Sequence, residues 1–192
     1  MQFVLNKIRA FYRDTRGTMV VEFVIMLPLL TTLLVAMVVY FDAFRTKSVN
    51  LKAAYTLSDM ISREVPIIDG DYVDGLKIVF DFLVESPQPT WIRVSLIQFD
   101  TGDVDNPGDS SDDRYFVRWS DATDGEPVHT DATIAAIKGD IPIMPHGDSV
   151  LIVESHMKYF PAFNVGLDPI DLDNRIVTRP RFAPPCWEDC NS

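Results

Sequence analysis

The chain has 192 residues, 47% of which are hydrophobic, and a formal net charge of −11. This length suits one compact domain plus one short additional segment, and the acidic balance excludes nucleic-acid binding, which needs a basic surface. The charge is unevenly distributed: residues 1–17 carry four basic residues and one acidic residue, whereas residues 42–192 carry 13 basic and 26 acidic residues. Between these two parts lie residues 18–41, in which Glu22 is the only charged residue.

Residues 18–41 predict a transmembrane helix. About 20 predominantly apolar residues are enough to cross a bilayer, and this segment has 24 residues with a single acid. A cleaved secretory signal would have a shorter apolar region ending in small residues, whereas this one passes directly into Asp42 and Ala43. Because Lys and Arg residues that flank a span stay on the cytoplasmic side, we expect residues 1–17 to form a basic cytoplasmic leader and residues 42–192 to form an exterior domain.

Two residues interrupt the apolar character of this segment. Pro28 removes a backbone hydrogen bond and is expected to kink or loosen the helix. A carboxylate in a membrane helix costs on the order of 2.5–3.5 kcal/mol near the centre and less near the edge. Glu22 therefore either lies at the cytoplasmic interface, where it reaches water, or needs a charged partner inside the bilayer or inside an assembly.

Residues 42–64 predict an amphipathic helix that continues the membrane helix outward and ends before Pro66. Its apolar residues recur at roughly helical spacing, with Arg, Lys and Ser between them. These residues are Phe44, Leu51, Ala54, Leu57, Ile61 and Val65. A second helix is predicted from Tyr72 to Val84, with Asp69 or Asp71 as its N-terminal cap.

The pattern changes after residue 90. Segments rich in β-branched and aromatic residues, bounded by turn residues, predict strands at 91–99, 114–119 and 149–159, with a fourth at about 175–180. Helices followed by strands indicate an α+β fold, in which the long N-terminal helix leads into a domain with a small antiparallel sheet.

Residues 100–140 contain eleven acidic and three basic residues and predict an acidic loop region. Carboxylates at this density could bind calcium, which takes oxygen ligands. The part with the highest density of carboxylates is residues 102–113. It lacks the EF-hand pattern, because it contains Pro107 and no glutamate at the closing position. We therefore favour a solvated acidic loop that joins two strands.

The chain has two cysteines, Cys186 and Cys190. An exterior position would permit a disulfide between them, and two free thiols in a loose tail are the alternative. A metal site is disfavoured because no Cys/His spacing suggests further ligands. The sequence holds no recognisable constellation of nucleophile, base and oxyanion donor. We accordingly predict no enzymatic activity, no metal and no cofactor.

The head of the hydrophobic segment carries the most specific motif. The basic leader ends at Gly17, the apolar run begins at once, and Glu22 is the fifth residue after the glycine. This arrangement resembles the processing site of type IV prepilins and pseudopilins, in which a membrane peptidase cuts after the glycine on the cytoplasmic face. The resemblance implies cleavage between Gly17 and Thr18. The Glu22 carboxylate could then neutralise the new ammonium group of Thr18, on the same chain or on a neighbouring subunit.

The resemblance extends to the TadE/TadG-like minor pseudopilin family of the tight-adherence (Flp, type IVc) pilus. The G-x-x-x-V-E-F-x-x-x-x-P arrangement common in that family is matched from Gly17 to Pro28, and residues 57–63 and 153–161 resemble its post-membrane helix and late strand. This implies a single-pass protein of the bacterial inner membrane, with its N-terminus cytoplasmic and its C-terminus periplasmic.

The family also implies partners: the prepilin peptidase, membrane lipid, other pilins or pseudopilins, and the pilus assembly machinery. The chain would support assembly of an adhesive pilus, either within the membrane machinery or inside the filament. The alternative is a membrane-tethered exterior domain that binds or hydrolyses a ligand and keeps residues 1–41 as an uncleaved signal anchor.

Overall fold

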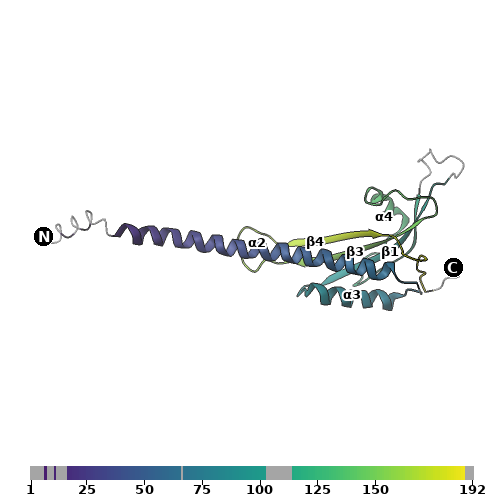
Figure 1. The fold of residues 1–192 in the computed structure, drawn as a ribbon, viewed down its shortest axis with the longest axis horizontal. Coiled ribbons are helices and arrows are strands. Elements are labelled where there is room, and N and C mark those ends of the chain that lie inside the picture. The colour runs from purple at the N-terminus through teal and green to yellow at the C-terminus, as the bar shows by residue number, and fades with distance from the viewer. Residues whose placement is uncertain (1–6, 8–10, 12–16, 66, 103–113, 189–192) are drawn as a thin grey trace. The chain divides into compact units, whose positions relative to one another are not determined.

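A computed structural model of the chain describes residue 7, residue 11 and residues 17–65, 67–102 and 114–188. Figure 1 shows a long helix and a small sheet, so the fold is α+β as predicted. The elements are α2 (Thr18–Ser62), α3 (Gly70–Val84), β1 (Thr90–Asp100), β2 (Arg114–Ala122), α4 (Asp131–Ala136), η2 (Lys138–Asp140), β3 (Ser149–Tyr159) and β4 (Ile170–Thr178). They fall into two compact units: Met1–Asp42 with Pro161–Asp168, and Ala43–Phe160 with Pro169–Ser192.

The first unit contains the apolar part of α2. Within the described residues, α2 is the one helix long and apolar enough to cross a membrane. It continues without interruption through Pro28, because the single missing backbone bond is flanked by intact turns on both sides. The hydroxyl groups of Thr31 and Thr32 donate to the carbonyl oxygens of Leu27 and Pro28, respectively, at 3.0 and 2.7 Å. These two hydroxyl groups are therefore satisfied within the helix itself.

The second unit is built on a four-stranded antiparallel sheet with the order β2-β1-β3-β4. The bounds of β3 match the prediction, and β1 and β2 extend slightly beyond theirs. The last strand differs: β4 begins at Ile170 rather than at Arg175, and it ends at Thr178. Its first half contains Asp171, Asp173 and Asn174, whose residue types are uncommon in strands, and pairing with β3 decides its start.

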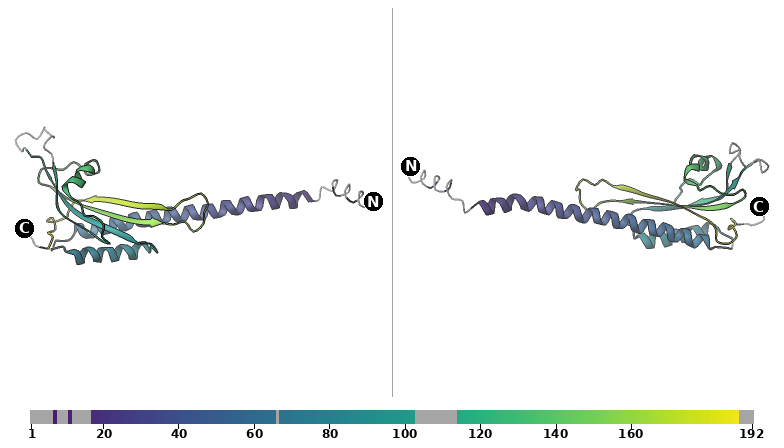
Figure 2. Two further views of the ribbon diagram at one scale, coloured as in Figure 1. Left: turned by 180° about the vertical axis from the view of Figure 1, so that it is seen from behind. Right: turned by 45° about the horizontal axis from the view of Figure 1, so that its top comes forward.

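One face of the sheet is covered by α3 and by the second half of α2, as Figures 1 and 2 show. The side chain of Asn50 on α2 donates to the carbonyl oxygen of Leu172 at 3.4 Å and accepts from Asn174 at 2.6 Å, so it bonds α2 to β4. Of the face predicted for residues 42–64, Ala54, Leu57 and Ile61 are buried. Phe44 and Leu51 are exposed, and Val65 lies beyond the end of α2 at Ser62.

The helix α3 begins at Gly70, two residues before the predicted start at Tyr72. Asp69 is its N-cap, because the Asp69 carboxylate accepts a hydrogen bond from the Tyr72 backbone N–H at 2.9 Å. Its buried face consists of Val73, Leu76, Phe80 and Val84. The helix ends at Glu85, which adopts the left-handed conformation and donates its backbone N–H to the Asp81 carbonyl oxygen at 2.9 Å.

The opposite face of the sheet carries a second hydrophobic core under α4, a helix that the sequence analysis did not predict. Its buried residues are Ile97, Phe99, Ile134, Ile141, Met144, Val150 and Ile152. The helix has only six residues and buries only Ile134, so it shows no periodicity in the sequence. Residues 100–140 are thus not a continuous loop, since they also contain β2 and η2.

Candidate functional site

The residues of the predicted processing site lie together at the head of α2. Gly17 directly precedes the helix, which begins at Thr18, and Glu22 lies one turn further along the same face. These three residues line one open groove with Phe11 and Val21. No atom lies within 4 Å of a side chain added at Gly17, so the bond after Gly17 is at an uncovered junction.

An exposed apolar surface surrounds Glu22. Every residue from Thr18 to Leu34 is exposed in the chain by itself. Such a continuous apolar surface must be covered by lipid or by other apolar helices, because contact with water would be strongly unfavourable. A carboxylate at the first turns of this surface can reach the water at one end, or it can meet a positive charge brought by a partner.

The second unit contains a buried carboxylate that the sequence analysis missed. Glu154 on β3 lies directly between Arg93 on β1 and Arg175 on β4 in the strand register. Arg93 Nε donates to Glu154 Oε2 at 2.6 Å, and Arg175 Nε donates to Glu154 Oε1 at 2.7 Å. The imidazole Nε2 of His129 also bonds to Oε2, at 2.8 Å. The signal in the sequence was a single acid directly after the apolar run Val150–Val153 of this strand, but its partners depend on the register.

These contacts set the protonation state of Glu154. Burial by itself would raise the pKa of this carboxyl, because it penalises the charged form. The hydrogen bonds from His129 and Arg175 and the positive charge of Arg93 outweigh that effect and lower the pKa to about 2. Glu154 is therefore a fixed negative charge that holds three strands and the segment before α4 together, and it is too acidic to act as a general base near neutral pH.

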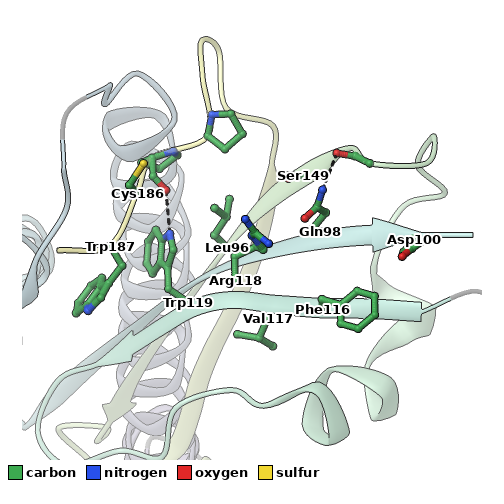
Figure 3. Close-up of a pocket in the computed structure, with 13 residues that line it drawn as sticks. Leu96, Gln98, Asp100, Phe116, Val117, Arg118, Trp119, Ser149, Cys186 and Trp187 are labelled. Atoms are coloured by element: carbon green, nitrogen blue, oxygen red, sulfur yellow. Dashed lines mark hydrogen bonds between the residues drawn. The ribbon is translucent and has the colours of Figure 1, made fainter. Parts of the chain in front are cut away.

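A cleft of about 780 Å³ lies between β1, β2 and the segment that follows β4 (Figure 3). In Figure 3, the side chains of Leu96 and Arg118 occupy the middle of the cleft, and Trp119 lies under the segment that contains Cys186. The cleft lining includes the hydroxyl group of Ser149, but no histidine is among its described lining residues. The described lining residues therefore include no serine–histidine pair.

The segment that closes this cleft accepts two hydrogen bonds through its backbone carbonyl groups. The indole Nε1 of Trp119 donates to the Pro185 carbonyl oxygen at 2.9 Å, and the Ile68 backbone N–H donates to the Cys186 carbonyl oxygen at 2.8 Å. The sulfur of Cys186 is disulfide-bonded. Cys190, the other cysteine of the sequence, lies outside the described residues.

The acidic segment 103–113, which was considered for calcium, lies outside the described residues, and the described residues contain no group of three or more possible metal ligands. Gly147 lies in a tight turn before β3, with a φ of +77° that favours glycine and a bond from its N–H to the Phe99 carbonyl oxygen at 2.8 Å.

Comparison of the chain with known protein families, with curated proteins and with solved structures finds no match.

Proposed function

We propose that this chain is a minor pseudopilin that supports assembly of a tight-adherence type IV pilus and is processed by a prepilin peptidase after Gly17. The observation that carries the proposal is the head of α2. An uncovered glycine stands directly before a 45-residue helix, and a single carboxylate follows on the first turns of its exposed apolar surface. A peptidase needs an accessible, extended bond, and an assembling helix needs an apolar surface to bury.

In this proposal α2 has two roles along its length. Residues 18–41 anchor the chain in the bacterial inner membrane, with the basic leader on the cytoplasmic side and the acidic domain in the periplasm. Residues 43–62 are the amphipathic continuation of the anchor. Burial of Ala54, Leu57 and Ile61 beside the exposed Lys52 and Tyr55 supports this role.

Glu22 has a role in assembly rather than in anchoring. Cleavage after Gly17 creates an ammonium group on Thr18, four residues from Glu22 on the same helix face. Away from water, each of these two charges is costly alone and much less costly as a pair. The pair forms either within one subunit or between the terminus of one subunit and Glu22 of its neighbour.

The test of processing is the N-terminal sequence of the mature protein, determined in cells with and without an active prepilin peptidase. We expect Thr18 as the first residue only where the peptidase is active. Gly17→Leu should block cleavage, whereas Thr18→Ser, the matched control at the adjacent position, should be processed normally. A wild-type protein that still begins at Met1 in the presence of the active peptidase would refute the proposal.

The test of Glu22 separates assembly from insertion. Glu22→Ala should abolish or strongly reduce piliation while the protein is still recovered in the membrane fraction, because removal of a charge favours insertion. Met19→Ala, at a neighbouring exposed position, should leave piliation intact. Normal piliation with Glu22→Ala would show that the charge pair is not needed.

A further inference from the structure

One residue of the apolar helix is covered although its neighbours are not. Val39 is 2% exposed, whereas Val38 and Tyr40 on either side are 56% and 42% exposed. Val35 and Ala36, one turn earlier, are half-buried. The covered residues therefore form a stripe along one side of α2. Within this unit, the segment that can cover the stripe is Pro161–Asp168, the loop between β3 and β4. Figure 1 shows the loop beside α2.

The composition of this loop differs from that of the rest of the exterior part. Residues 42–192 carry a net charge of −13, but Pro161–Asp168 has Asp168 as its only charged residue and contains Phe163, Val165 and Leu167. Phe163 is 58% exposed. A loop that is mostly apolar, with an exposed aromatic ring and one acidic residue at its end, is suited to a lipid surface rather than to water.

The position of the covered stripe along the helix places the loop at a defined depth. Val39 is 21 residues after Thr18, which corresponds to about 32 Å of helix at 1.5 Å per residue, and the hydrocarbon core of a bilayer is about 30 Å thick. Irregular backbone cannot lie exposed to hydrocarbon, because its polar groups would be unsatisfied. A loop that covers Val39 therefore lies at the outer boundary of the bilayer, where headgroups and water are available.

We propose that the β3–β4 loop is a second membrane contact of this protein, in which Phe163 inserts into the headgroup region of the leaflet that faces the acidic domain. The exposed rings of Tyr40 and Phe41 on α2 belong to the same unit and complete an aromatic belt at that interface. The contact fixes the rotation of α2 about its own axis, since the loop covers only one side of the helix. This inference rests on the proposed membrane-spanning role of α2.

The test places a fluorescent reporter in the loop of the full chain. Phe163→Trp is reconstituted in vesicles of phosphatidylcholine and phosphatidylglycerol, with and without lipids that carry bromine near the headgroup end of the acyl chains. Phe182→Trp is the matched control, since Phe182 is 67% exposed in a loop beside Arg181, whose backbone N–H bonds to the last residue of α2, Ser62. The unmodified chain supplies the background from its three native tryptophans.

We expect the emission that Phe163→Trp adds to be shifted to the blue and mostly lost with the brominated lipids, whereas the emission added by Phe182→Trp should be unaffected. Added emission at the wavelength of a water-exposed indole, with no more quenching than in the control, would overturn the proposal. Ala162→Trp, at an adjacent exposed position, gives a second reading if Phe163→Trp does not fold.

The result of this quenching experiment does not depend on whether the chain is cleaved after Gly17. A chain that the peptidase does not cleave would refute the pseudopilin proposal and leave the quenching unchanged, because the loop contact requires only that α2 crosses the bilayer. Correct processing together with an unquenched Phe163→Trp would refute the loop contact alone.

Discussion

Replacement of Glu154 by glutamine should destabilise the second unit by about 3 kcal/mol. The side chain of Glu154 is only 6% exposed, and that of its partner Arg93 is 14% exposed, so solvent screens the pair weakly. The pKa of this carboxyl is about 2 in the folded protein against an ordinary value of 4.5, and each pKa unit corresponds to about 1.4 kcal/mol. Removal of one partner from a buried ion pair typically costs about 3–5 kcal/mol, which agrees with this value.

The assay is urea unfolding of the full chain in detergent micelles, followed by the fluorescence of Trp91, Trp119 and Trp187, which all lie in the second unit. The control is Asp171→Asn, which removes the exposed ion pair between Asp171 and Lys158 and should cost at most about 1 kcal/mol. If Glu154→Gln unfolded within about 0.5 kcal/mol of the wild type, as an ordinary surface substitution does, the structural role assigned to Glu154 would be wrong.

The same residue gives the wild-type protein a specific pH dependence. The pKa of Glu154 is lower in the folded state than in the unfolded state, so its stabilising effect is fully present above pH 4.5 and is lost as the pH falls towards 2. We expect the free energy of unfolding of the wild type to fall by about 3 kcal/mol more than that of Glu154→Gln over this interval. Parallel pH curves for the two proteins would contradict the pKa of about 2.

Two further predictions concern the helices. Leu57→Ala should cost about 2–5 kcal/mol because Leu57 is fully buried, whereas Leu33→Ala, at an exposed position of the same helix, should leave unfolding of the second unit unchanged. Asp69→Ala should cost about 1 kcal/mol because it removes the cap bond to the Tyr72 N–H, and Asp71→Ala should cost less, since the cap bond remains. Both pairs are measured by urea unfolding in micelles, and equal losses within a pair would refute the assigned role.

The elements with a strong local sequence pattern could be predicted from that pattern alone. The bounds of β3 were predictable because Ser149–Tyr159 is a run of strand-forming residues with a turn before it. The apolar part of α2 was equally clear, since its length and lack of charge leave few alternatives. Two weak elements were missed: α4 has six residues and buries only one, and the first half of β4 contains Asp171, Asp173 and Asn174, whose residue types are uncommon in strands.

Of the two candidate sites, one could be predicted from neighbouring residues and the other could not. Gly17, Thr18 and Glu22 are close in sequence, so helical geometry alone places them on one groove. The Glu154 network unites residues 93, 129, 154 and 175, which are adjacent only because of the strand register and the segment before α4. Nothing within ten residues of Glu154 indicates these partners.

The sequence by itself therefore determined the apolar helix and most of the strands, and it contains the Gly17–Glu22 motif on which the processing proposal rests, because periodicity, hydropathy and a glycine before the helix are properties of neighbouring residues. Only the tertiary structure decided which carboxylate is buried between two arginines and which loop covers Val39. Both features depend on contacts between residues that are distant in the sequence, and the free energy of such contacts depends on the packing of the whole unit rather than on local composition.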